Sequence, residues 1–254
     1  MSVEARLRAA LLELEATRHR ASEDKAARER ALAILAHELR GPLMPILVMA
    51  HVLETDPTLS ARQHAAAASI RRNVEVEDRL IADLFDLTRI ATGKMELALA
   101  DPDVERELRE VLSGCSREIA DKGLTVVSEL LADDHRVRAD PIRLYQVLWN
   151  LLHNAVKFTP AGGTITLRST SGRPGRLVVE LADTGIGIEP QLLSRIFEPF
   201  EQGSGELNRR SGGLGLGLAI CKGLVDAHGG ALSVRSDGPG KGATFTLELP
   251  LAAG

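Results

Sequence analysis

The chain has 254 residues, 44% of them hydrophobic, and its 31 basic and 35 acidic side chains give a net charge of −4 and a pI near 6.0. This length suits one large domain or two modest ones, and the acidic balance with only 3% aromatic residues excludes an obvious nucleic-acid-binding surface. No signal peptide or membrane-spanning run occurs, and Cys115 and Cys221 lack metal-ligand spacing, so we expect no membrane insertion by this chain and two reduced thiols in a cytoplasmic protein.

The first helical segment carries apolar residues at alternating steps of four and three, from Leu7 to Leu39. This spacing is typical of a coiled-coil seam, although polar residues interrupt its middle. We therefore expect residues 1–25 to form a coiled-coil lead-in. The alternative is a single solvated helix.

His37 lies in the same helical pattern, within the sequence Ala-His-Glu-Leu-Arg-Gly-Pro-Leu of residues 36–43. It is two residues from Leu35 and from Leu39, about 200° around the helix from each, so its ring is predicted to face solvent. A histidine near apolar residues is more often part of a core, but the phase argues against that here. Pro42 removes a helical hydrogen bond beside His37 and predicts a bending element. The alternative is an incidental kink.

These residues resemble the H-box of sensor histidine kinases, His-Glu-Leu-Arg-x-Pro-Leu. The resemblance implies that ATP phosphorylates His37, that Glu38 orients the ring and takes its proton, and that Arg40 supplies positive charge near the phosphoryl group. Many family members carry Thr or Asn four residues after the histidine, where it helps to remove phosphate from the partner regulator. Here that residue is Gly41, so we expect kinase activity with weak or no phosphatase activity.

A turn at residues 55–60 separates this helix from a second one, for which Ser60 is a good N-cap. The second helix begins at Ala61, carries a regular apolar face and ends near Gly93. Two such helices form a hairpin with too little core to stand alone, whereas two hairpins bury both apolar faces as a four-helix bundle. We therefore expect a homodimer, with residues 26–94 as the dimerisation and histidine phosphotransfer domain.

From residue 95 onward helices alternate with β-rich runs, which predicts an α+β fold for the chain and a catalytic ATP-binding domain over residues 95–254. The expected strands are Gly123–Leu130, Gly163–Ser169, Arg176–Ala182, Ala231–Ser236 and Ala243–Leu249. The expected helices are Val104–Ala120, Ile142–Phe158, Gln191–Ile196 and Leu216–His228. The polar, glycine-rich stretch Glu198–Gly213 has the length of a lid, and Gly229 lies where a helix C-cap belongs.

Asn150, Asn154 and Lys157 recur at i, i+4 and i+7 and line one face of a predicted helix. The alternative, a merely solvated face, would more often carry Glu and Arg than two amides. The segment resembles the N-box of the same family, which implies that Asn154 coordinates Mg²⁺, Lys157 contacts phosphates and Phe158 packs against adenine. Related ATPases of the gyrase and chaperone type carry a glutamate at the position of Asn150, and an amide cannot act as that base.

Three glycine-containing motifs follow. Asp183 with Gly185 and Gly187 resembles the G1 box, in which the carboxylate accepts from the adenine amino group and the glycines allow a close approach. Ile196–Phe200 resembles the F-box, with Phe197 as either lid hinge or core. The segment of Gly213, Gly215, Leu216 and Gly217 resembles the G2 box, whose helix N-terminus suits phosphates, and Gly240–Phe245 resembles a third glycine motif. Arg209 or Arg210, on the presumed lid, is expected to reach the γ-phosphate.

Five motifs in order, downstream of an H-box, resemble the catalytic core of sensor histidine kinases of bacterial two-component systems over residues 30–251. The resemblance implies a four-helix bundle followed by an α/β sandwich of the Bergerat type, the cofactors ATP and Mg²⁺, and a response-regulator receiver domain as partner. No P-loop or protein-kinase signature is present. Two alternatives remain: a degenerate kinase that only docks a receiver, and an ATP-driven conformational machine.

Overall fold

The computed structural model describes residue 39, residues 41–201 and residues 214–252. The chain divides into two compact units, Met1–Gly93 and Lys94–Gly254. The interpretations made for residues 1–25 and for the phosphoacceptor histidine lie outside the described residues. Gly93 has a φ of +68° and follows the last turn of the second helix of the first unit. A glycine tolerates this left-handed conformation without the strain that a side chain would add.

The first unit is a helical hairpin. Residues 41–55 are helical, and after a turn the helix α2 runs over Ala61–Ala91. Ser60 is the N-cap of α2, as predicted, and both its backbone N–H and its hydroxyl donate to Gln63 Oε1, at 2.8 and 2.6 Å. In the turn, the backbone N–H and hydroxyl of Thr58 donate to Asp56 Oδ1, at 2.8 and 2.7 Å. These local hydrogen bonds replace the helical ones that the turn interrupts.

The two helices of the hairpin are joined by an ion pair and by small buried side chains. Arg71 on α2 donates from Nε to Glu54 Oε2 at 2.7 Å and from Nη1 to Glu75 Oε1 at 2.8 Å. Ala50 and Ala67 are each 2% exposed. The bond from Arg71 to Glu54 connects the two helices and sets their register near the turn.

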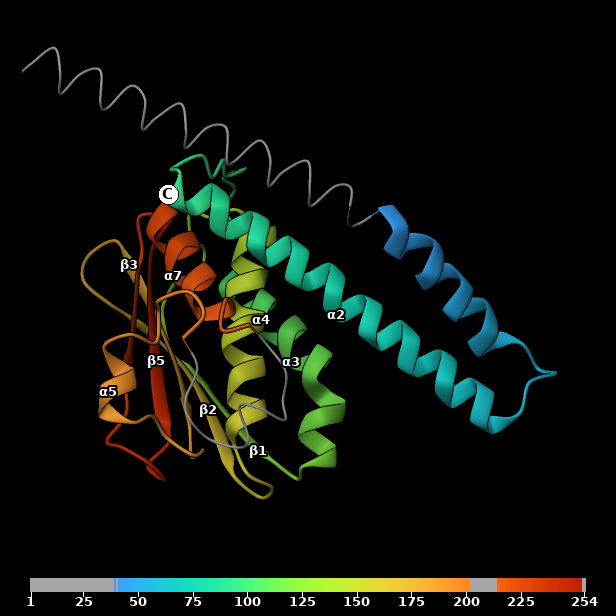
Figure 1. Ribbon diagram of the computed structural model, residues 1–254. Helices are drawn as coiled ribbons and strands as arrows, with labels where there is room; N and C mark the ends of the chain where they lie inside the picture. Colours follow the sequence, from blue (N-terminus) through green and yellow to red (C-terminus); the bar gives the residue numbers. More distant parts are fainter. Residues whose placement is uncertain (1–38, 40, 202–213, 253–254) are drawn as a thin grey trace, which may run out of the picture. The chain divides into compact units, whose positions relative to one another are not determined.

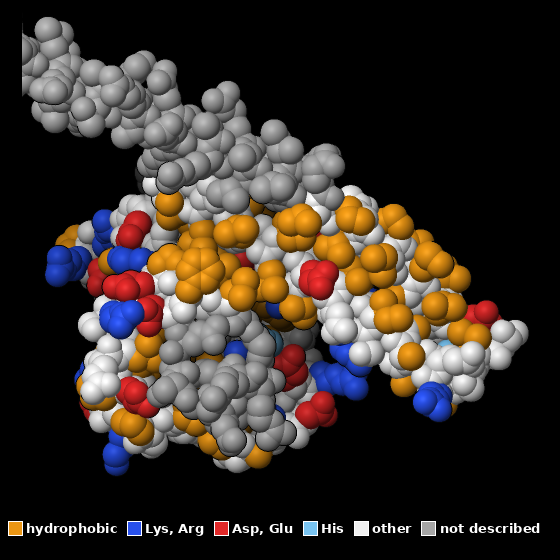
Figure 2. Space-filling model, viewed as in Figure 1, with side chains coloured by type: hydrophobic (Ala, Val, Ile, Leu, Met, Phe, Trp, Pro, Cys, Tyr) orange, Lys and Arg blue, Asp and Glu red, His pale blue; other side chains and the backbone are white. Residues whose placement is uncertain are grey.

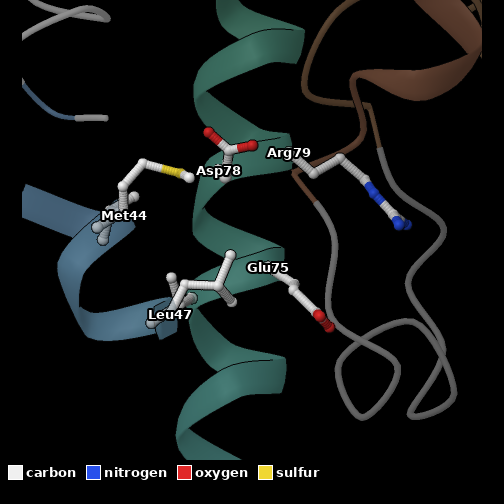
Figure 3. A pocket seen from close by; sticks show the side chains of 7 residues that line it. Met44, Leu47, Glu75, Asp78 and Arg79 are labelled. Carbon is white, nitrogen blue, oxygen red and sulfur yellow. The ribbon is translucent and has the colours of Figure 1, made fainter. Parts of the chain in front are cut away.

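The hairpin also exposes a large apolar surface, which Figure 2 shows as hydrophobic side chains gathered along it. The exposed residues include Met44, Ile46, Val48, Met49, Val52, Leu53, Ile70, Val76 and Leu84. A groove of about 410 Å³ lies between the helices, lined by Leu43, Met44, Leu47, Val74, Glu75, Asp78 and Arg79. In Figure 3, Met44 and Leu47 reach from residues 41–55 toward α2, where Asp78 lies. A monomeric protein rarely exposes so much contiguous apolar surface.

The second unit contains a five-stranded sheet with the order β1-β2-β3-β5-β4. The strands are β1 (Thr125–Leu130), β2 (Thr164–Ser171), β3 (Arg176–Asp183), β4 (Ala231–Arg235) and β5 (Ala243–Pro250). β1 pairs with β2 in parallel, and the other pairs are antiparallel. The last strand in the sequence therefore lies inside the sheet, between β3 and β4.

Three helices, α3 (Val104–Asp121), α4 (Pro141–Phe158) and α7 (Gly217–Ala227), cover one face of this sheet (Figure 1). The strands alternate buried and half-buried residues, and the buried ones face the helices. On the opposite face Arg168 pairs with Glu129 at 2.7 Å and with Glu180 at 3.7 Å, all partly exposed. The unit is a two-layer α/β sandwich, and the predicted α+β class is confirmed.

The two longest helices of this unit, α3 and α4, each start at an aspartate. Asp103 Oδ1 accepts from the N–H groups of Glu105 and Arg106 at the start of α3. Asp140 does the same for α4, where Pro141 occupies the first helical position. The second carboxylate oxygen of Asp140 accepts from Ala98 N–H at 2.9 Å. This bond fixes the segment that enters the unit against the start of α4.

One predicted helix is shorter than expected. The helix α5 covers only Pro190–Leu193, and residues 194–200 form turns instead of continuing to Ile196. The apolar residues Leu192, Leu193 and Ile196 are only half-buried. With so little apolar surface to bury, a continued helix gains little from packing.

The sole Trp and sole Tyr of the chain lie together on α4. The rings of Tyr145 and Trp149 stack with centroids 6.1 Å apart, and His153 stacks on Trp149 at 6.0 Å. A Cβ added to Gly114 of α3 would lie 2.6 Å from the Trp149 ring. Gly114 therefore allows the indole to pack closely against α3.

Candidate nucleotide-binding site

The polar face predicted for the helix Ile142–Phe158 is present on α4. Asn150, Asn154 and Lys157 are half-buried, whereas the other side of the helix is buried through Leu148, Leu151, Leu152 and Ala155. Burial lowers the pKa of the Lys157 ammonium group. Its Nζ lies 4.8 Å from the centre of the Phe158 ring, within reach of a cation–π interaction. The helix thus offers two amides and one amine on a surface backed by apolar core.

The loop after β3 packs against the C-terminal end of α4. Asp183, the last residue of β3, accepts from Gly185 N–H at 2.7 Å, and Ile186 N–H donates to Phe158 O at 3.1 Å. A Cβ on Gly185 would lie 2.6 Å from Phe158 O, so only glycine permits this approach. Burial raises the pKa of Asp183, and hydrogen bonds from the Gly185 and Ala243 backbones partly offset that rise. A half-buried carboxylate is thereby placed beside the end of α4.

A second glycine loop, residues 238–242, lies against the loop after β3. Gly187 has a φ of +69° and its Cβ would lie 2.1 Å from Gly238 O. Gly242 has a φ of +67° and its Cβ would lie 1.9 Å from Asp183 O. Two backbone hydrogen bonds join the loops, from Gly240 N–H to Ile186 O at 2.6 Å and from Gly242 N–H to Gly185 O at 3.1 Å. The two glycine loops therefore form one seam beside Asp183.

Ser236 is a residue of this seam that the sequence did not single out. Its hydroxyl donates to Gly242 O at 2.6 Å and accepts from Ile188 N–H at 3.0 Å. One side chain thus ties the first glycine loop to the second. Its position between a strand and a glycine-rich loop is the sequence signal that could have indicated this role.

The N-terminus of α7 lies at the polar face of α4. A Cβ on Gly217 would come within 3.8–3.9 Å of the Asn150 amide. Gly215 has a φ of +72° and accepts, through its carbonyl, the Phe200 N–H at 3.1 Å. Leu216 is buried, whereas Phe200 is 62% exposed and has a φ of +67°, a conformation rare outside glycine. The F-box residues thus end against the start of α7, and Phe197 is half-buried.

The structure brings together Asn150, Asn154, Lys157, Phe158, Asp183, Gly185, Gly187, Gly215, Leu216 and Gly217, which come from three separate sequence motifs. Five other predicted site residues, His37, Glu38, Arg40, Arg210 and Gly213, lie outside the described residues, as does Arg209. The site suits a nucleotide, because backbone amides at a helix N-terminus bind phosphates. The glycines at positions 185, 187 and 215 let the loops around the site approach neighbouring backbone closely. Asn154 offers one hard oxygen ligand for Mg²⁺, which usually takes its other ligands from phosphates and water.

Comparison with known proteins matches the same two parts of the chain. Residues 27–93 match the His Kinase A (phospho-acceptor) domain. Residues 139–253 match the histidine kinase-, DNA gyrase B- and HSP90-like ATPase domain. The fold and site therefore define a phospho-acceptor hairpin followed by an ATPase-type nucleotide-binding domain.

Whole-chain relatives agree. The signal transduction histidine-protein kinase BarA of Escherichia coli strain K12 is 34% identical over 94% of this chain and 26% of its own length. The autoinducer 2 sensor kinase/phosphatase LuxQ of Vibrio cholerae is 36% identical over 93% of this chain and 28% of its own. This chain thus spans between a quarter and a third of the length of these two curated relatives.

Two solved structures are also similar. Full-length ShkA in complex with AMPPNP superposes with a TM-score of 0.75 at 36% identity, covering 89% of this chain and 46% of ShkA. The catalytic domain of the histidine kinase ThkA superposes with a TM-score of 0.53 at 30% identity, covering 61% of this chain and 98% of that domain. The chain belongs to the histidine kinase family.

Among the described residues, no helix combines the length and the apolar character required to cross a bilayer.

Proposed function

We propose that this chain binds ATP with Mg²⁺, phosphorylates its own His37, and passes the phosphoryl group to an aspartate of a response-regulator receiver domain. The observation that carries this proposal is the meeting of three motifs on α4. Gly217 of α7 lies against Asn150, and the loop of Asp183 and Gly185 lies against Phe158. These contacts define a site with a carboxylate at one end and a helix N-terminus at the other.

The two ends of the site, one with a carboxylate and one with a helix N-terminus, orient the nucleotide. The Asp183 carboxylate accepts from the adenine amino group, and Phe158 packs against the base. The amides at the start of α7, near Asn150, face the phosphates together with Lys157. Bound Mg²⁺ supplies neutralisation of phosphate charge, and Asn154 holds it through its amide oxygen. On the same proposal, Gly213 and Arg210 complete the phosphate side.

Asn150 decides what the bound nucleotide does. A carboxylate at this place would accept a proton from water and promote hydrolysis, whereas an amide cannot. ATP is therefore retained until an external nucleophile arrives. This feature separates the proposal from an ATP-driven conformational machine, which would hydrolyse ATP without any phosphorylated histidine.

The nucleophile is a neutral imidazole nitrogen of His37. It attacks the γ-phosphorus, a P–N bond forms, and the bond to the bridging oxygen of ADP breaks. Glu38 takes the ring proton and Arg40 stabilises charge on the transferring group. Catalysis is then mostly positioning and charge stabilisation.

The hairpin is proposed to act as a homodimer. Its exposed apolar residues, among them Val48 and Met49 at 58% and 66% exposure, are those that a second hairpin would bury in a four-helix bundle. Light scattering across protein concentrations tests this. A chain that stays monomeric at every concentration contradicts it.

The kinase proposal is tested with γ-labelled ATP. The purified chain should incorporate acid-labile, base-stable phosphate, and His37→Ala should abolish incorporation while still binding a fluorescent ATP analogue. Asp183→Asn should weaken nucleotide binding instead. A chain that binds ATP but incorporates nothing is a docking module, and equal incorporation by His37→Ala contradicts the assignment of the acceptor.

We further propose that phosphatase activity is weak or absent because Gly41 carries no side chain where family members use Thr or Asn. A Cβ at Gly41 would meet nothing within 4 Å, so Gly41→Thr is tolerated sterically. This variant should accelerate phosphate release from a phosphorylated receiver domain, with Gly41→Ala as the control for removing glycine from the helix. Brisk release by the unaltered chain, unchanged by Gly41→Thr, contradicts the idea.

A further inference from the structure

Lys122 makes three contacts to the end of the helix that carries the N-box. Its Nζ donates to the carbonyl oxygens of Val156 at 2.7 Å, Lys157 at 2.9 Å and Thr159 at 3.1 Å. An ammonium group has three donor protons, so three acceptors satisfy it completely. All three acceptors belong to the last turn and C-cap of α4, where the helix presents its partial negative charge.

The remaining carbonyls of this last turn have other partners. Ala155 O accepts from the backbone N–H of Thr159 at 3.0 Å and from its hydroxyl at 2.6 Å. Phe158 O accepts from Ile186 N–H, in the loop that follows Asp183, at 3.1 Å. A helix end normally leaves four carbonyls without helical partners. Here one side chain supplies most of the missing donors, and the nucleotide loop supplies another.

Lys122 is itself held in place by its backbone. It is the C-cap residue of α3, and its carbonyl accepts from Gly162 N–H at 3.0 Å. Its side chain is half-buried. The residue therefore connects the end of α3, the turn before β2 and the end of α4.

We propose that Lys122 is a positioning residue for nucleotide binding. Its ammonium group holds the last turn of α4, and this turn carries both Lys157 and Phe158 and receives the hydrogen bond from Ile186. This inference rests on the proposed function, because it assumes that ATP binds against that turn. Lys122 has no motif of its own, and it touches neither base nor phosphates in this proposal.

Lys122→Met tests the inference, because it keeps the length of the side chain and removes the charge and all three donors. Loss of charge-assisted hydrogen bonds should raise the Kd for a fluorescent ATP analogue about tenfold. Autophosphorylation at saturating ATP should change little, so the effect falls on KM rather than on kcat. Lys122→Arg retains the charge and donors and should recover most of the affinity.

Lys222→Met is the matched control. Lys222 pairs with Asp226 one turn along α7, at 2.8 Å on the partly exposed surface, and such pairs contribute little. The control should bind ATP like the unaltered chain. If Lys122→Met lowers the melting temperature but leaves the Kd unchanged, the lysine is merely structural and the inference is overturned.

Hydrogen exchange supplies a readout that needs no nucleotide. Lys122→Met should lose protection at the Ile186 amide while the amides of β5 stay protected, and unchanged protection at Ile186 overturns the inference. An unaltered chain that binds no nucleotide refutes the proposed function instead. Should Lys122→Met not fold, Lys122→Gln and Lys122→Arg are compared by the same two measurements, and equal affinity in both overturns the need for charge at this position.

Discussion

The seam between the two glycine loops gives a prediction in which two neighbouring glycines are matched controls for each other. Gly240 and Gly242 both have left-handed backbones, with φ of +74° and +67°. A Cβ at Gly240 would meet nothing within 4 Å, whereas a Cβ at Gly242 would lie 1.9 Å from Asp183 O. Replacing each by alanine therefore separates backbone strain from steric clash.

The size of each effect follows from these contacts. Gly240→Ala adds only the left-handed conformation, about 1–2 kcal/mol. Gly242→Ala adds the same strain, and the clash also separates the loops, which breaks the hydrogen bonds of Gly242 with Gly185 and Ser236. At about 0.5–1.5 kcal/mol for each bond, Gly242→Ala should destabilise the unit by about 2–5 kcal/mol in total.

Urea unfolding followed by the fluorescence of the sole tryptophan, Trp149, measures both variants in the intact chain, because this residue lies in the second unit. Nucleotide affinity should fall more in Gly242→Ala than in Gly240→Ala, because the clash displaces the backbone of Asp183. Equal loss of stability in the two variants refutes the reasoning, since it would mean that the close approach to Asp183 O is not maintained in solution.

Three further predictions concern the core of the second unit. Gly114→Ala, which in an open helix would stabilise, should instead destabilise by about 1–3 kcal/mol and shift Trp149 emission, because its Cβ would clash with the indole; a stabilised variant contradicts this packing. Burial lowers the pKa of His228, whose ring accepts from Asp140 N–H at 2.9 Å. The unfolded chain therefore binds a proton at His228 more readily than the folded chain does. The free energy of unfolding should fall as the pH drops below about 6.5 and level off above it. A His228→Gln variant whose free energy of unfolding depends on pH in the same way contradicts this. Burial raises the pKa of the Cys115 thiol to about 11, so at pH 8 it should resist alkylation until urea unfolds the chain, as followed by mass spectrometry.

Most secondary structure of the second unit was predictable because its elements have strong local signals. The helix α4 was predicted from Ile142 to Phe158 and observed from Pro141, since Asp140 and Pro141 mark its start plainly. The predicted strand ends differ from the observed ones by at most two residues. The short helix α5 was overestimated because its apolar residues do not find a core to pack against.

The contacts of the site were only partly predictable. Periodicity placed Asn150, Asn154 and Lys157 on one face, because that depends only on helix geometry. The contact between Gly217 and Asn150 depends on how α7 packs beside α4, which no local pattern encodes. The same holds for Ser236 and Lys122, whose partners lie between six and 48 residues away in sequence. Such residues look ordinary in a sequence, and their roles appear only when tertiary structure brings backbone groups to them.

The place of β5 inside the sheet has a consequence for the synthesis of this protein. Its residues, Ala243–Pro250, are the last of this sheet to leave the ribosome, yet β5 is the strand that pairs with both β3 and β4 and connects them. Until β5 has emerged, β3 and β4 each expose the edge that will pair with it, together with apolar residues that the complete sheet covers. Chaperones bind such surfaces, and such surfaces promote aggregation. A nascent chain that stalls before residue 243 would contain the helices and the other four strands of the second unit but not a completed domain.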